Sequence, residues 1–96
     1  MFTHIVFFKL IDGSEESVNK VASILEAMEG KIPELKEIEV GRDVLHTERS
    51  YDLALTTKFN SKEDMDVYQV SNYHVNEVLK YIKPMIKSSK TVDYLG

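Results

Sequence analysis

The sequence has no cysteine and no glycine-rich loop. Without cysteine the chain has no disulfide and no thiolate to act as a nucleophile or a metal ligand. This lack of cysteine fits a reducing compartment. The four glycines, Gly13, Gly30, Gly41 and Gly96, are too widely spaced to form a phosphate-binding loop. No nicotinamide or flavin site is indicated, and we expect no cofactor.

Long hydrophobic runs are also absent. The apolar segment from Met1 to Ile11 contains His4 and Lys9, is too short to span a membrane, and lacks the pattern of a secretory signal. We therefore expect a soluble, cytoplasmic protein that does not bind membranes. The net charge of −4 and the lack of a basic stripe argue against nucleic-acid binding. The nearest basic cluster is interpreted as a solvated edge: Lys80, Lys83, Lys87 and Lys90.

With 96 residues, the chain is long enough for one domain, which we assign to residues 1–96. A domain of this size buries only about 60–65% of the surface that its unfolded chain exposes. Its stability is therefore limited, and association with another copy is a common remedy.

Hydrophobic periodicity and capping residues predict the order β-α-β-β-α-β. Ser14 is the expected N-cap of the first helix, and Gly30 suits its left-handed C-terminal end. Ser71 and Asn72 are expected to interrupt the second helical region. Beyond this break, an apolar stripe at helical spacing is expected to face the core: Val75, Val78, Leu79 and Ile82. The predicted strands are 2–10, 35–42, 51–59 and 91–95, and the predicted helices are 15–29, a short one opening at 60–64, and 73–82.

The first strand is apolar on both faces, because Val6 and Phe8 alternate with Ile5 and Phe7. The element order predicts an α+β, ferredoxin-like fold: a four-stranded antiparallel sheet with both helices on one face. The other face would then be bare and apolar, as at an interface. We therefore expect two copies to pair through their sheets as a homodimeric α/β barrel, with room for a cavity.

Several segments match the motifs of a known family: Thr3 to Lys9, Glu39 to Asp43, Tyr51 to Leu55 with Phe59, Tyr68 to His74, and Val92-Asp93. Together they resemble the stress-responsive dimeric A/B barrel family, known as Dabb. The resemblance covers nearly the whole chain and implies the same fold and a homodimer. One branch of the family is similar to polyketide cyclases that catalyse an intramolecular aldol condensation.

The resemblance to the cyclase branch implies catalytic roles for four residues. His74 falls on the helix base, Tyr68 on an assisting tyrosine, His4 on a pocket histidine, and Asp93 on the carboxylate that supports the base. The chain departs from the branch in two places. Leu53 stands where the cyclase has a histidine, and Ser71-Asn72 replaces a frequent His-Pro.

The chemistry of these side chains is compatible with such roles. If Ser71 caps the helix, His74 lies in the first turn, where the helix dipole disfavours an imidazolium and leaves a neutral base. Asp93 would fix the tautomer of His74, as the orienting carboxylate does in hydrolytic triads. The phenol of Tyr68 would donate to an oxygen that becomes negative as a neighbouring carbon loses its proton.

Structural roles explain the same residues. A capping or core-edge role for His74 is as well supported as a catalytic one. Packing and satisfied hydrogen bonds are the favoured explanations for Tyr68, His4 and Asp93. His4, His74 and Asp93 would also form a two-histidine, one-carboxylate metal set, but they come from distant elements and lack helical ligand spacing, so we expect no metal.

Three functions remain open at this point. The leading hypothesis is a cofactor-free enzyme that abstracts a proton next to a carbonyl of a polyketide-like or phenolic substrate. The alternative is a non-catalytic, stress-related dimer, or a dimer that binds a small hydrophobic ligand. A third hypothesis is a cofactor-free monooxygenase acting on quinols.

Overall fold

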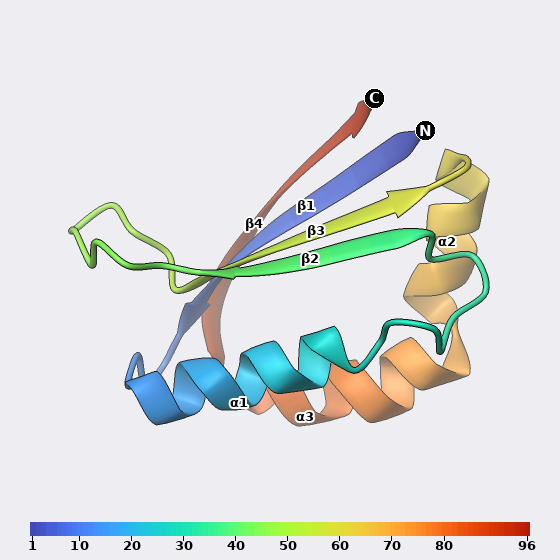
Figure 1. Cartoon of the computed structure of the whole chain (residues 1–96). Coiled ribbons are helices and arrows are strands. Elements are labelled where there is room, and N and C mark those ends of the chain that lie inside the picture. Colours follow the sequence, from blue (N-terminus) through green and yellow to red (C-terminus); the bar gives the residue numbers. More distant parts are fainter.

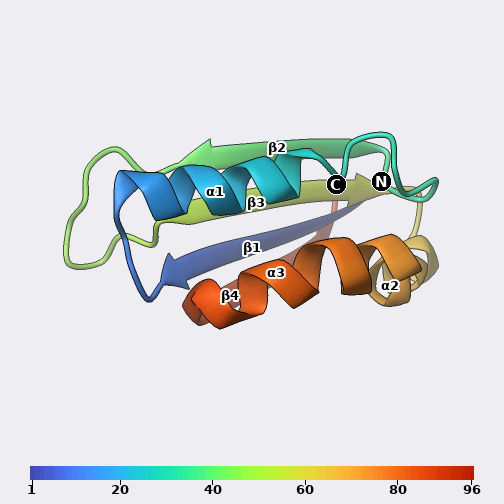
Figure 2. The ribbon, with the colours of Figure 1, turned by 90° about the horizontal axis from the view of Figure 1, so that it is seen from below.

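The computed structural model describes all residues, 1–96. Its sheet has the strand order β2-β3-β1-β4, and every neighbouring pair is antiparallel (Figure 1). The helices lie on one face of the sheet (Figures 1 and 2). This confirms the predicted ferredoxin-like fold. The elements are β1 (Phe2–Leu10), α1 (Glu15–Glu26), β2 (Glu37–Arg42), β3 (Leu53–Phe59), α2 (Lys62–Val70), a π-helix (His74–Leu79), α3 (Lys80–Ile82), a 3-10 turn (Lys83–Met85) and β4 (Ile86–Leu95).

Helix α1 begins where the sequence predicts and ends earlier. The Ser14 hydroxyl accepts a hydrogen bond from the Ser17 N–H at 3.2 Å and so caps the helix. The helix stops at Glu26 instead of residue 29, because the chain forms turns that lead to Gly30. Gly30 has φ +77°, the left-handed conformation predicted for it, which costs a glycine little. No helix in the structure is both long and apolar enough to cross a membrane.

The core lies between the sheet and the helices. Alternate residues of β1 point into it, and so do those of β3 with which they pair, such as Val6 and Leu55. The aromatic rings of Phe59 and Tyr68 pack at 4.9 Å between centroids. The largest fully buried side chains come from both layers: Tyr68, Phe59, Leu25, Met28, Leu53 and Ile82.

The second helical region is interrupted at Ser71, as predicted, and then continues as a π-helix. Val75, which an α-helical stripe would bury, is 42% exposed, so that prediction is wrong. In a π-helix the hydrogen bonds join residues five apart, which shifts the side chains around the axis. Tyr73, five residues before the buried Val78, packs against the core instead.

Strand β4 is longer than predicted, because it begins at Ile86 and not at residue 91. Its first half is polar and carries little strand signal. The register nevertheless pairs Ser88 with Lys9 and Ser89 with Phe8, so backbone hydrogen bonds to β1 set its length. Strand β4 is an edge strand and is exposed over nearly its whole length.

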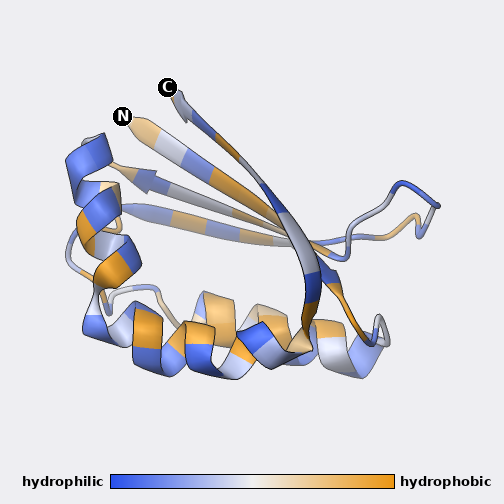
Figure 3. Cartoon of the chain, turned by 180° about the vertical axis from the view of Figure 1, so that it is seen from behind, coloured by the Kyte–Doolittle hydropathy of each residue, from blue (hydrophilic) through white to orange (hydrophobic).

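No element of the chain covers the second face of the sheet (Figure 3). Ile5 of β1 is paired with Thr56 and Val92, so these three side chains share that face. Phe7 is 38% exposed and Val92 is 52% exposed. The first strand is thus buried on one face only within a single chain, as the sequence led us to expect.

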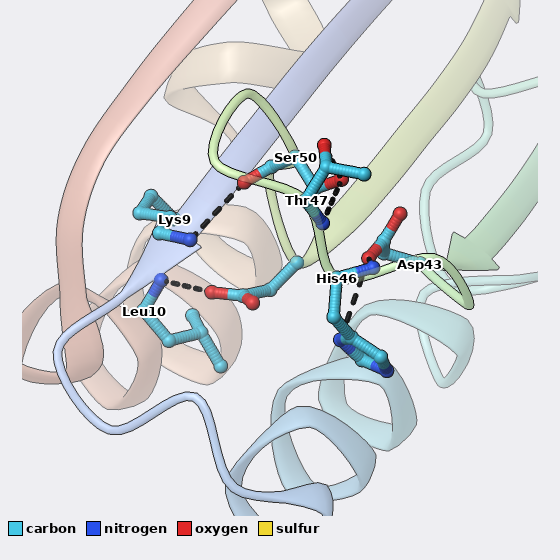
Figure 4. A network of polar contacts seen from close by, with 7 residues as sticks. Lys9, Leu10, Asp43, His46, Thr47 and Ser50 are labelled. Atoms are coloured by element: carbon cyan, nitrogen blue, oxygen red, sulfur yellow. Dashed lines mark hydrogen bonds and ion pairs between the residues drawn. The ribbon is translucent and has the colours of Figure 1, made fainter.

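A polar network lies at the end of the sheet where β1 ends and β3 begins (Figure 4). The buried Asp52, just before β3, accepts a hydrogen bond from the Leu10 N–H through Oδ2 at 2.8 Å. The backbone N–H of Asp52 donates to the Phe8 carbonyl at 2.8 Å. Nearby, the Lys9 ammonium donates to the Ser50 carbonyl at 3.1 Å. Asp52 therefore ties the end of β1 to the loop that enters β3.

We expect Asp52→Ala to lower the free energy of unfolding by about 1–3 kcal/mol, because the buried Leu10 N–H loses its acceptor. Urea unfolding at a fixed protein concentration measures the change. The control is Asp66→Ala, which removes an exposed carboxylate that pairs with Lys62 on the surface of α2 and should change stability far less. Equal losses in the two variants would contradict this role of Asp52.

Candidate active site

His4 and Asp93 form a hydrogen-bonded pair on the inner face of the sheet. The two residues are direct cross-strand partners, His4 on β1 and Asp93 on β4. His4 Nδ1 contacts Asp93 Oδ1, and the His4 side chain is only 11% exposed, compared with 39% for Asp93. Because an ionised carboxylate only accepts hydrogen bonds, Nδ1 carries the proton and Nε2 is left for other partners.

His74 is the first residue of the π-helix. Its backbone N–H donates to the Ser71 hydroxyl at 3.2 Å, which confirms the predicted first-turn position. Its ring Nδ1 lies 3.0 Å from the Gln69 carbonyl oxygen. A carbonyl only accepts, so Nδ1 is protonated and Nε2 carries the lone pair in the neutral ring.

The predicted pairing of Asp93 with His74 is wrong. Asp93 bonds to His4, and a backbone carbonyl takes the orienting place beside His74. The reason is topological: β4 lies next to β1 in the sheet, so Asp93 meets His4 across the strands. The orienting carboxylate therefore belongs to the strand histidine and not to the helix histidine.

Burial lowers the pKa of His74, since removal from water disfavours the charged ring. The hydrogen bond to the Gln69 carbonyl opposes part of this shift, and a charge on the nearby His4 adds to it. His74 is therefore neutral at pH 7, the form that a general base requires.

Tyr68 packs beside His74, and its hydroxyl contacts Met28. Its ring packs 4.5 Å from the His74 ring, and the residue is 1% exposed. The hydroxyl points to the Met28 sulfur at 3.7 Å, and burial raises the pKa of the phenol. In this arrangement Tyr68 packs against the His74 ring, and its hydroxyl is engaged with Met28 instead of a ligand.

Sequence reasoning missed two supporting groups. Thr57 is fully buried opposite His4 on β3, and its hydroxyl donates to the His4 carbonyl at 3.1 Å. Threonine is a common residue in strands, so the supporting role of Thr57 could not be recognised from the sequence. The second group is the Gln69 carbonyl, a backbone atom whose position depends on where α2 ends.

The structure brings His4, Asp93, His74 and Tyr68 to one end of the sheet, near the two termini (Figure 1). None of the four hollows on the surface is lined by any of these side chains. No group of three or more histidine or acidic side chains is placed to hold one metal ion. The chemistry available here is proton transfer at an imidazole, and one of the two imidazoles is hydrogen-bonded to a carboxylate.

Comparison with known proteins agrees with this architecture. A dimeric ferredoxin-like protein of unknown function from Thermobifida fusca is 26% identical, with a TM-score of 0.84, and the match covers 99% of this chain and 90% of that one. One from Bacteroides fragilis is 29% identical, with a TM-score of 0.81, covering 99% and 95%. The hydroxynitrile lyase of Passiflora edulis is 18% identical, with a TM-score of 0.79, covering 97% and 90%, and shares the fold. A comparison with curated proteins finds no match.

These similarities define the chain as a small α+β protein with a ferredoxin-like fold. The model of the stress-responsive A/B barrel domain matches residues 2–95. The chain therefore belongs to the Dabb family, as its motifs indicated.

The lowered pKa of His74 predicts a pH-dependent stability. In the unfolded chain His74 takes up a proton near its ordinary pKa of about 6.5, whereas the folded chain resists protonation. The unfolded state thus binds more protons, and this contribution to stability is lost as the pH falls below about 6.5. We expect the free energy of unfolding to decrease from pH 7 to pH 5, and the decrease to be smaller in His74→Gln. Urea titrations at one protein concentration test this, and an identical slope in the variant would refute it.

Proposed function

We propose that this protein is a cofactor-free acid–base catalyst that removes a proton next to a carbonyl of a small, polyketide-like or phenolic substrate. One observation carries the proposal: the two neighbouring imidazoles are held by different partners, His74 by the Gln69 carbonyl and His4 by Asp93. An acid–base pair needs two neighbouring groups whose surroundings favour different charge states.

The roles follow from the hydrogen bonds. His74 is the base, because it is neutral and its Nε2 has a free lone pair. His4 is assigned as the acid, because the Asp93 carboxylate holds its Nδ1 and leaves Nε2 to donate to the carbonyl oxygen. As the C–H bond breaks, its electron pair forms the enolate and the proton moves to His74. The proton of His4 neutralises the developing charge on oxygen.

The substrate would approach from the solvent side of the pair. His74 is half-buried and the Asp93 side chain is 39% exposed, so the site opens at the surface near the start of β1 and the end of β4. The same fold occurs in a relative described as a hydroxynitrile lyase. The fold therefore occurs in at least one enzyme.

The test is exchange of the protons next to the carbonyl of 4-hydroxyphenylacetone in D₂O, followed by NMR. We expect His74→Gln and His4→Gln each to slow the protein-catalysed exchange by about a hundredfold or more. Tyr68→Phe should leave the rate nearly unchanged, because the hydroxyl that it lacks faces Met28 and not the substrate.

No exchange above the buffer rate with this ketone and with a small panel of polyketide-like ketones would reject the catalytic proposal. A loss in Tyr68→Phe equal to that in His74→Gln would reject the assigned roles. Oxygen consumption with quinols in place of exchange would instead support the monooxygenase hypothesis.

A non-catalytic dimer is the second candidate. It is favoured by the lack of a hollow at the histidines and by the inward-facing Tyr68 hydroxyl. In that case His4 and Asp93 join β1 to the edge strand β4, and substitutions there change stability alone.

We also infer that the protein forms a homodimer through the uncovered sheet face. Ile5, Phe7, Val92 and Tyr94 place apolar surface there, and no element of the chain covers it. The charges at the two edges of this face are complementary, with Glu37 and Glu39 on β2 and Lys90 on β4. A second copy turned about an axis along the strands would bring each acidic edge over a basic one. The two similar proteins from Thermobifida fusca and Bacteroides fragilis are described as dimeric.

Val92→Asp should convert the dimer to a monomer at micromolar concentration, because a charge would be buried without a partner. The matched control is Val70→Asp, which changes an exposed valine on α2, away from the sheet. Sedimentation velocity measures both variants. If the two behave alike, the uncovered face is not the interface.

A further inference from the structure

A second site lies at the opposite end of the sheet from the histidines. His4 is near the start of β1, whereas this hollow begins beyond its end, at Gly13. The hollow has a volume of about 620 Å³ and lies between the first turn of α1 and the loop that joins β2 to β3. A volume of this size accommodates a small organic molecule. None of its lining residues takes part in the proposed chemistry.

Asp52 presents a half-satisfied carboxylate to this hollow. The residue is 8% exposed, and its Oδ2 accepts the Leu10 N–H, whereas Oδ1 has no hydrogen-bond partner within the protein. No fully shielded side-chain oxygen or nitrogen lacks a partner, so Oδ1 is in contact with the open volume. A Cβ at Gly13 would lie 3.5 Å from Oδ1. The missing side chain at Gly13 therefore leaves the oxygen uncovered.

The hollow carries a net negative charge. Glu15, Asp43 and Asp52 contribute three carboxylates against the one guanidinium of Arg42, a net of −2 with His46 neutral. Arg42 is directed along α1, where Nε donates to Asn19 at 3.0 Å and Nη2 contacts Glu26 at 3.4 Å. It therefore does not neutralise Asp52. The ligand expected here is a cation.

The arrangement favours an organic cation over a metal ion. No three acidic or histidine side chains are placed around one point, as a metal ion would require. Asp43 is already engaged, because its Oδ2 accepts the His46 N–H at 2.7 Å and lies 3.4 Å from His46 Nδ1 (Figure 4). Val18 and Val44 add apolar surface to the lining. An ammonium group offers up to three N–H donors on a carbon chain that can pack against such surface.

We propose that this hollow is a binding site for a small aliphatic amine in its ammonium form. The ammonium donates to Asp52 Oδ1, the acidic rim formed by Glu15 and Asp43 attracts it, and the alkyl chain lies against Val18 and Val44. The site is independent of the proposed acid–base chemistry, since it shares no residue with the histidine end.

The probe is n-butylammonium chloride, titrated at pH 7 and constant ionic strength, with the amide NMR signals of Leu10 and Gly13 as reporters. We expect saturable shifts at these two amides. n-Butanol has the same chain without the charge and should produce none that saturate. His74→Gln, altered at the other end of the sheet, should bind the probe as the unmodified protein does.

Two variants test the carboxylate. Asp52→Asn keeps an oxygen for the Leu10 N–H and removes the charge, and it should weaken binding by about tenfold or more. Gly13→Ala covers Oδ1 with a methyl group and should weaken binding similarly. If Asp52→Asn does not fold, Gly13→Ala and Glu15→Gln decide the question. An unchanged affinity in Gly13→Ala, or an equal response to n-butanol, overturns the proposal.

Discussion

The pairing of the edge strand β4 with β1 is the interaction on which the other features depend. It places Asp93 opposite His4, so that a carboxylate reaches the inner face of the sheet beside a buried imidazole. It also widens the uncovered face by adding Val92 and Tyr94 to the apolar residues of β1. One backbone ladder thus organises both the candidate site and the proposed interface. Because β4 is an edge strand, a partner that covers it would also hold the site in place.

Sequence patterns were sufficient to predict the fold. The Ser14 cap and the left-handed Gly30 are local features, and each is found where the pattern placed it, whereas β2 and β3 each begin two residues later than predicted. The errors lie where tertiary contacts decide the outcome. The first half of β4 is a strand because β1 pairs with it and not because of its composition. Val75 is exposed because the helix widens, which no apolar stripe reveals.

The candidate residues were found from the sequence, whereas their partners were not. Asp93 follows a family motif, but whether it meets His4 or His74 depends on the strand order. The acceptor for His74 is a backbone carbonyl, and side-chain motifs contain no information about it. Tyr68 has the residue type of an assisting phenol, yet its hydroxyl points into the core. The residue types therefore predicted which residues form the cluster, and the structure was needed to assign the hydrogen bonds that each one makes.

The π-helix gives the second helical region a change of phase. The extended Ser71 separates α2 from the π-helix, and the wider turns of the π-helix then shift its first residues around the axis relative to the α-helical repeat of α3. His74 stands at the start of that offset, while Val78 and Ile82 beyond it are buried in the core. The orientation of His74 is therefore set separately from the packing that anchors the helix in the core. The wider turn thus separates two tasks within one helix, the presentation of His74 and the packing of Val78 and Ile82.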